Sequence, residues 1–322
     1  MSADDRLDAN NEWYTMIAEA RRQLEELKNS LSISEFLYGY YELILNYIDG
    51  LAPYGIKWLK AFQAMLQYEA WRHKAMRSVK ESSNMNLILV LGIEMRNALV
   101  KLLRQLERIY PQNSFEVITL QLLRAECLYQ LGHTGEVIEA LDKAIEAGCD
   151  HPLVYFALGF NIYRQALQDY VEVEPTTQRA IITDRKAFEG LCERAIGAFR
   201  SGISAAGTEP MDAQLHFWIG IVYETLGRHS EAKREYERTI EIAPELSKEV
   251  EQRLKHIQRA EIQSGRHTEV TQTERPTEPQ EISKLERLGR ITDEEVSKMG
   301  DLLGKIDTLS EFLKSSEGTG EN

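Results

Sequence analysis

The hydrophobic residues of this chain recur with helical periodicity over most of its length. Residues 213–244, AQLHFWIGIVYETLGRHSEAKREYERTIEIAP, predict two short amphipathic helices joined by a tight turn at Leu226–Gly227. Small residues at Gly220 and Ala232 let these helices approach closely, and a tyrosine one turn further along each helix fills the space beside them. One such hairpin cannot bury its own apolar face, so the pattern also predicts neighbouring hairpins.

The spacing within residues 213–246 resembles the tetratricopeptide repeat (TPR), a helical hairpin of about 34 residues with large, small, aromatic and Pro positions at set offsets. The chain departs from that pattern at His216, the first aromatic position, and at Thr239, the third small position. Strict alternation of apolar and polar residues is scarce, which predicts no sheet. The resemblance implies an all-α fold in which TPR-type hairpins stack as a right-handed α-solenoid.

Counting back in the same frame places a first unit at residues 118–151. Its Leu131–Gly132 pair repeats the turn of the unit at 213–246. It departs from the family pattern at Arg124, where an apolar residue is expected, and at Cys149, where proline is expected.

A second unit spans residues 152–209 and is longer than the others. Ile162 and Ala195 lie 33 positions apart, whereas the equivalent residues of the third unit are nine apart. We therefore expect an insertion at about 164–187, part of which extends the two helices. Insertions of this kind often serve binding, and the alternative is a lengthening without function.

Residues 1–32 predict an N-terminal amphipathic helix. Trp13, Ile17, Leu24 and Leu27 fall roughly on one face of it. The helix packs on the edge of the domain or, alternatively, makes a short coiled-coil contact.

Residues 33–112 form an aromatic-rich helical module without the repeat pattern. Three helices are predicted, the first capped by Ser34 and ended by Gly50, and the second preceded by Pro53. The third is apolar on nearly all sides over residues 87–93, which predicts that this part is buried.

The second helix of this module, over residues 54–80, is basic. In a protein of net charge −13 it carries six basic residues against Glu69 alone. It is a solvated face with the aromatic residues turned inward, or a dock for an acidic partner or an anionic membrane surface. The six residues are Lys57, Lys60, Arg72, Lys74, Arg77 and Lys80.

After the third unit, residues 247–264 predict a charged capping helix, which repeat arrays need at their ends. Residues 265–280 are polar, without apolar periodicity, and predict a disordered linker. Residues 281–322 predict a flexible tail with a short helical element, in which Thr292 and Glu295 form a capping box. This element is loosely similar to SHOCT-type helical hairpins.

The charge of the chain argues against general nucleic-acid binding, because phosphate contacts need a basic surface. Three widely spaced cysteines suit a reducing compartment. The polar, acidic first residues do not resemble a secretory signal, and the longest apolar run falls far short of the roughly 20 residues that span a bilayer. We therefore expect a cytoplasmic protein, with membrane contact at most peripheral.

No catalytic, cofactor or metal site is predicted. The seven histidines are widely spread, and Cys149-Asp150-His151 is the only close set of candidate ligands. The sequence has neither a phosphate-binding glycine loop nor a Gly-x-Ser-x-Gly nucleophile motif. These observations favour a protein that is not an enzyme.

In TPR arrays the first helix of each hairpin lines a concave groove. The groove offsets of the family fall here mostly on apolar and aromatic residues, which predicts a site for an amphipathic helix or an extended peptide. The positions are Leu122, Glu126 and Tyr129 in the first unit, Phe156, Phe160, Tyr163 and Arg164 in the second, and Phe217, Ile221 and Glu224 in the third.

Two occupants of this groove stay open: an external protein partner, or the chain itself, through its N-terminal module or the tail around Leu302–Leu313. The TPR type that clamps a C-terminal carboxylate is not expected, because Leu122 and Glu126 stand at its first Lys and Asn positions. The leading hypothesis is a non-enzymatic interaction adaptor or scaffold. The alternatives are a membrane-peripheral or assembly scaffold that uses the basic helix 54–80, and a self-associating TPR protein.

Overall fold

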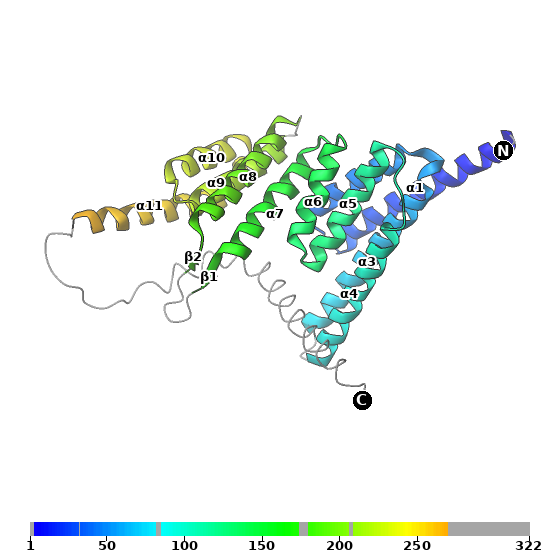
Figure 1. Cartoon of the computed structure of the whole chain (residues 1–322), viewed down its shortest axis with the longest axis horizontal. Helices are drawn as coiled ribbons and strands as arrows, with labels where there is room; N and C mark the ends of the chain where they lie inside the picture. Colours follow the sequence, from blue (N-terminus) through cyan, green and yellow to red (C-terminus); the bar gives the residue numbers. More distant parts are fainter. Residues whose placement is uncertain (1–2, 32, 82–84, 174–179, 206–208, 270–322) are drawn as a thin grey trace. The chain divides into compact units, whose positions relative to one another are not determined.

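The structure is a computed structural model that describes residues 3–31, 33–81, 85–173, 180–205 and 209–269. This described part is almost entirely helical, as Figure 1 shows. Its α-helices are α1 (Ala3–Leu31), α2 (Glu35–Asp49), α3 (Ile56–Glu81), α4 (Met85–Leu106), α5 (Ser114–Leu131), α6 (Thr134–Glu146), α7 (Pro152–Tyr170), α8 (Arg185–Ser204), α9 (Glu209–Thr225), α10 (His229–Ile242) and α11 (Ser247–Glu269).

The chain divides into two compact units. The first comprises Met1–Lys74 and Ala98–Ala260, and the second comprises Ala75–Asn97 and Glu261–Asn322. The first unit holds α1, α2, most of α3 and all the helices from α5 to α10. The second holds the first half of α4. The predicted burial of residues 87–93, in this half of α4, is wrong: Val90 is 51% exposed, and within the stretch Gly92 alone is buried.

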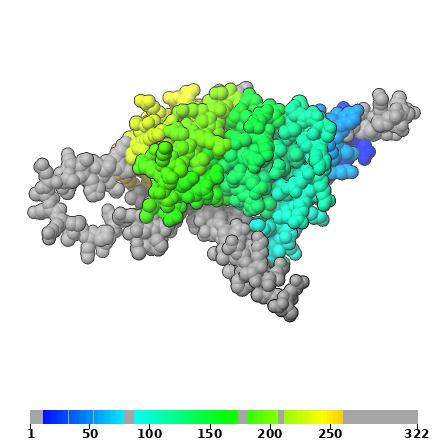
Figure 2. All heavy atoms as spheres, viewed as in Figure 1, coloured from blue at the N-terminus to red at the C-terminus, as the bar shows by residue number. Residues whose placement is uncertain are grey.

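Three antiparallel helical hairpins follow one another in the first unit: α5–α6, α7–α8 and α9–α10. Each hairpin packs against the next, through α6 with α7 and α8 with α9, and the space-filling view in Figure 2 shows them in close succession. The expected turn pairs are confirmed. Gly132 and Gly227 adopt left-handed backbone angles, with φ of 80° and 73°, a conformation that other residues adopt only with strain. The all-α hairpin solenoid is therefore the fold of this unit.

Close approach of the two helices depends on a glycine and an aromatic ring in two of the hairpins. A Cβ atom added at Gly159 would lie 2.6 Å from the ring of Phe199, and one added at Gly220 would lie 2.6 Å from the ring of Tyr236. Both rings are fully buried. Thr239 is buried at its small position, and its hydroxyl is satisfied because it donates to the carbonyl of Glu235 at 3.0 Å within its own helix.

The insertion in the second hairpin contains a small β-hairpin, so the prediction of no sheet is wrong here. Strand β1 (Val171–Val173) pairs antiparallel with β2 (Ala180–Ile182), and Val171 lies opposite Ile182. These segments are rich in β-branched residues, which favour extended backbone. The expected lengthening of the helices is also present, since α7 runs to Tyr170 and α8 begins after the N-cap Asp184.

The N-terminal helices follow the sequence closely. The predicted apolar face of α1 is buried, at Trp13, Ile17, Leu24 and Leu27. Helix α2 begins where expected, because the hydroxyl of Ser34 accepts a hydrogen bond from the amide of Leu37. A short 3-10 helix, Ala52–Gly55, then leads into α3.

The C-terminal helix α11 is longer than the predicted cap. It continues to Glu269, so the expected disordered linker does not begin at residue 265. Val250 and Ile257 of α11 are buried in the first unit. The remainder of the linker, the tail element and its Thr292–Glu295 capping box lie outside the described residues.

We predict that Gly159→Ala destabilises the protein by about 1–2 kcal/mol, because overpacking against Phe199 outweighs the better helix propensity of alanine. The matched control is Gly197→Ala on α8. No atom lies within 4 Å of its added Cβ, and we expect it to stabilise by about 0.5–1 kcal/mol. Urea unfolding followed by circular dichroism measures both. Equal stability of the two variants would contradict the packing argument.

Candidate interaction groove

The ten predicted groove residues lie on the first helix of each hairpin: α5, α7 and α9. They are less exposed than their sequence suggests. Four are buried, and the remainder are half-buried. The buried residues are Leu122, Glu126, Tyr163 and Ile221.

The groove face of the first hairpin is covered by helix α2. The hydroxyl of Tyr40 donates to the backbone carbonyl of Leu122 at 3.1 Å, and both residues are buried. One turn earlier on α2, the ring of Phe36 lies 4.8 Å from the ring of Phe156 on α7. Helix α2 thus lies against α5 and the start of α7, the helices that carry the first of the predicted groove positions.

A buried polar cluster lies where α2 and α3 meet α5. Its two carboxyl groups belong to Glu69, which is 0% exposed, and Glu126, which is 7% exposed. The hydroxyl of Tyr41 lies 3.3 Å from an oxygen of each. The side-chain amide of Gln130 donates to Glu126 at 2.6 Å and to Glu69 at 3.0 Å. Arg72 donates to Glu69 at 2.6 Å.

This environment affects the two carboxyl groups unequally. Burial, together with the negative charge of Glu69, raises the pKa of Glu126 to about 7. Gln130, Arg72 and Tyr41 favour the ionised form but do not offset the burial. Arg72 makes its ion pair with Glu69, and none of the ion pairs between described side chains involves Glu126.

A cluster of aromatic rings, which we call the aromatic stripe, lies along α7 and α9 and begins at the ring that Phe36 of α2 contacts. Its members are Phe156, Phe160, Tyr163 and Trp218. Trp218 packs edge-on against Phe160 at 5.0 Å, against Phe156 at 6.2 Å and against Tyr163 at 6.5 Å. The rings of Phe160 and Trp218 stay half-buried. Edge-to-face packing of this kind holds the rings in fixed positions.

Trp218 was missed by sequence reasoning. The family offset selects its neighbour Phe217, but that ring packs within its own hairpin, 5.8 Å from the ring of Tyr236. Trp218 instead reaches across to the preceding hairpin. The sequence could have indicated Trp218 by its size, because a large aromatic residue one position from a groove offset can reach the same face.

The polar groove positions are engaged by other residues of the protein. The guanidinium of Arg164 stacks over the ring of Tyr129 at 5.4 Å. Glu224 accepts a hydrogen bond from Tyr236 at 2.6 Å and lies 3.8 Å from Arg253 of α11. Glu224 is thus held by the packing of the last hairpin.

The residues of the predicted basic patch have different surroundings. Lys57 pairs with Glu116 at 3.0 Å, and Arg72 points inward to Glu69. Lys60, Lys74 and Arg77 are exposed, whereas the side chain of Lys80 lies outside the described part. A binding role for this patch stays a prediction.

The closely spaced Cys149 and His151 have structural partners. Cys149 accepts a hydrogen bond from the hydroxyl of Tyr47 at 3.4 Å, and burial raises the pKa of its thiol. The ring of His151 accepts from the amide of Leu153 and so caps α7, and burial lowers the pKa of its imidazole. Among the described residues, no group of three or more His, Cys, Asp or Glu side chains is arranged to hold a metal ion.

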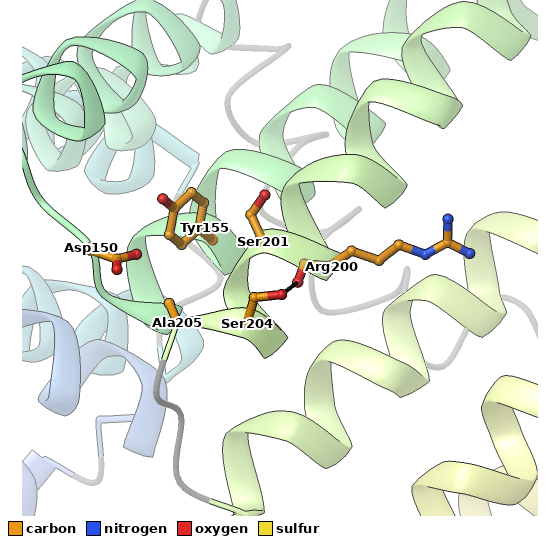
Figure 3. A pocket seen from close by; sticks show the side chains of 6 residues that line it. All are labelled: Asp150, Tyr155, Arg200, Ser201, Ser204 and Ala205. Atoms are coloured by element: carbon orange, nitrogen blue, oxygen red, sulfur yellow. Dashed lines mark hydrogen bonds between the residues drawn. The ribbon is translucent and has the colours of Figure 1, made fainter.

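An open hollow of about 360 Å³ lies between the start of α7 and the end of α8. Figure 3 shows Tyr155, Ser201 and Ser204 beside it, while the guanidinium of Arg200 points away from them. Arg200 donates instead to the hydroxyl of Tyr223 at 2.8 Å. The side chains around this hollow do not converge on a common point.

Within the described ranges, no helix combines the length and apolar character needed to cross a bilayer.

Residues 213–246 match the family model of the tetratricopeptide repeat. No match was found among the curated proteins compared with the chain. The solved structures with similarity include two crystal structures of MamA, at 19% and 15% identity. These cover 54% and 65% of this chain and 94% of MamA in each case, with a TM-score of 0.34 for both.

A third structure, YrrB, is described as a TPR protein with an unusual peptide-binding site. It is 16% identical, covers 76% of this chain and 93% of YrrB, and has a TM-score of 0.33. The tetratricopeptide-repeat match falls on the last of the three helical hairpins, α9–α10, and the two preceding hairpins pack in succession with it.

We predict that Tyr40→Phe destabilises the protein by about 0.5–1.5 kcal/mol, because it removes a buried hydrogen bond between α2 and α5. Tyr14→Phe, at a side chain that is 67% exposed, is the control and should leave the stability unchanged. Urea unfolding at pH 7 compares the two variants. An unchanged midpoint for Tyr40→Phe would show that this hydrogen bond does not stabilise the docking of α2.

Proposed function

We propose that this tetratricopeptide-repeat protein is an interaction scaffold, and that it binds a helical segment of a partner protein along the aromatic stripe of α7 and α9. One observation carries the proposal: helix α2 already lies on the same groove face and contacts α5 and α7 through Tyr40 and Phe36. A surface that accommodates one aromatic helix from its own chain has the chemistry to accept another.

The remaining groove offers anchor positions for such a helix. Phe160 and Trp218 are held against each other at 5.0 Å and keep part of their surface accessible. Rigid aromatic side chains that lose little conformational entropy on binding are the usual hot spots of protein interfaces. Arg164 lies one turn beyond Phe160 on α7 and adds a cation at the edge of the stripe.

The scaffold role agrees with the general use of TPR hairpins. Stacked helical repeats present extended binding surfaces, and their stability comes from contacts between neighbouring repeats. The structural partners of Cys149 and His151 leave these two residues without the arrangement of a nucleophile and its base.

To test the proposal, the partner is first captured from cell extract with the full chain, identified and purified. Its affinity is then measured by titration calorimetry against the wild type and against Phe160→Ala with Trp218→Ala. We expect the double variant to bind about 30-fold more weakly or worse, the effect of removing a hot spot of about 2 kcal/mol or more.

The matched control for this test is Tyr110→Ala, which removes an aromatic ring that is 78% exposed and lies outside the groove helices. It should bind as the wild type does. Wild-type affinity in the groove variant, with its helical content intact, would contradict the groove as the binding site.

A chain that ends at Glu269 separates an external partner from occupancy by the tail. Because the proposed site lies on α7 and α9, we expect this shortened chain to bind the purified partner at least as tightly as the full chain. Loss of binding on truncation would place the binding segment in residues 270–322 instead.

A further inference from the structure

The buried cluster of Tyr41, Glu69, Glu126, Gln130 and Arg72 joins three helices at the place where the N-terminal module enters the groove. We propose that Glu69 and Glu126 form a shared proton-binding site, and that proton binding strengthens the docking of α2 and α3 on the first repeat. The docking contact lies within the chain and is independent of the proposed partner.

The hydrogen-bond geometry provides the first argument. The hydroxyl of Tyr41 lies 3.3 Å from both carboxyl groups but has a single proton to donate. The amide of Gln130 has two and reaches both. When both acids are ionised they share these donors, and the oxygen that Tyr41 does not serve loses a hydrogen bond. A proton on one acid adds the missing donor.

The charges of the cluster provide the second argument. Among the side chains that the structure describes, Arg72 is the one cation that an ion pair places against the two carboxylates, so the fully ionised cluster of described residues holds a net negative charge in a buried site. Burial of an uncompensated charge is costly, and protonation of one acid removes that charge. On the geometry, Glu126 takes the proton, because Arg72 pairs with Glu69.

Apart from the imidazole of His73, the neighbouring ionisable groups on the helices packed around the cluster stay in one charge state near neutral pH. Burial raises the pKa of Tyr40 and Tyr41 on α2, of Tyr68 on α3, and of Cys127 and Tyr129 on α5. Burial lowers the pKa of Arg72, but the charge of Glu69 and the hydrogen bonds to it raise that pKa overall, so the guanidinium stays charged. Arg164 of α7 stacks on Tyr129, and His73 of α3 lies 3.4 Å from Arg72.

Among the described residues, His73 is therefore the one imidazole beside the cluster, and a variant of its own is needed to separate its titration from that of Glu126.

Glu126 itself is placed to respond to pH, because burial raises its pKa to about 7 in the folded protein. The folded state then holds the proton more tightly than the unfolded state does. Docking is strongest below neutral pH and weakens as the pH rises through 7.

The expected size of the effect follows from this linkage. If opening of α2 and α3 returns Glu126 to water, the equilibrium between open and docked states changes about tenfold between pH 6 and pH 8. Opening of α2 uncovers the groove face around Leu122, which α2 covers in the docked state.

The test compares hydrogen exchange of the full-length chain at pH 6 and pH 8. Exchange rates of peptides from α2 are divided by the intrinsic rates of an unfolded chain at the same pH, and peptides from α10 serve as an internal reference. In the wild type we expect opening of α2 to increase about tenfold from pH 6 to pH 8, relative to α10.

Glu126→Gln keeps the shape of the protonated acid but cannot titrate, so its α2 opening should not depend on pH. Glu139→Gln is the matched control, at an exposed acid of α6 that pairs with Lys143, and should behave as the wild type does. His73→Gln should also keep the wild-type dependence. A pH dependence that survives Glu126→Gln, or that disappears with His73→Gln, would overturn the proposal.

A second measurement does not depend on the folding of a variant. In the wild type labelled with carboxyl-¹³C glutamate, nuclear magnetic resonance should detect one side-chain carboxyl that titrates near pH 7, well above exposed glutamates. The same signal should move to lower pH in Glu69→Gln, because Arg72 is then free to pair with Glu126. Absence of any glutamate titrating above pH 6 in the wild type would exclude the proton site.

Discussion

Each helical hairpin of this protein leaves an apolar face that another element has to cover, and this constraint accounts for most of the arrangement of the first unit. Between hairpins the cover is the next repeat, through α6 with α7 and α8 with α9. At the C-terminal end α11 contributes, with Val250 and Ile257 buried. At the N-terminal side α2 has this role, and it covers part of the groove face as well. Helices α1 and α2 and the part of α3 up to Lys74 thus belong to the same compact unit as the repeats.

This arrangement divides the groove into two regions of different chemistry. The region over α5 is closed and contains a polar cluster with two acids from different helices. The region over α7 and α9 is aromatic and partly accessible. The second region exposes part of its rings without any rearrangement, whereas access to the first requires α2 and α3 to move. The proposed partner site and the contact of the N-terminal helices therefore lie on different parts of the repeat surface.

The sequence predicted the local features well, because they depend on neighbours along the chain. Ser34 as a helix cap, the turns at Gly132 and Gly227, and the apolar face of α1 follow from short-range spacing. The β-hairpin at Val171–Ile182 was missed, since three-residue strands are too short to show a period.

The groove was harder to predict than the fold. The family offsets placed Glu126 on a binding surface, but its burial depends on Tyr41 and Glu69, which come from helices far away in sequence. Trp218 was missed because its role comes from a contact with the preceding hairpin. The spacing of residues within one repeat does not predict either contact, because both involve residues from outside that repeat.

The close approach of Gly159 to Phe199, and of Gly220 to Tyr236, has an evolutionary consequence. A side chain at either glycine collides with the ring, and a smaller residue in place of the ring leaves a cavity beside the glycine. Neither position can change easily alone, whereas a larger residue at one together with a smaller residue at the other preserves the filled volume. The glycine and its ring are therefore expected to vary as a pair among related sequences, and the two helices of one hairpin to evolve together.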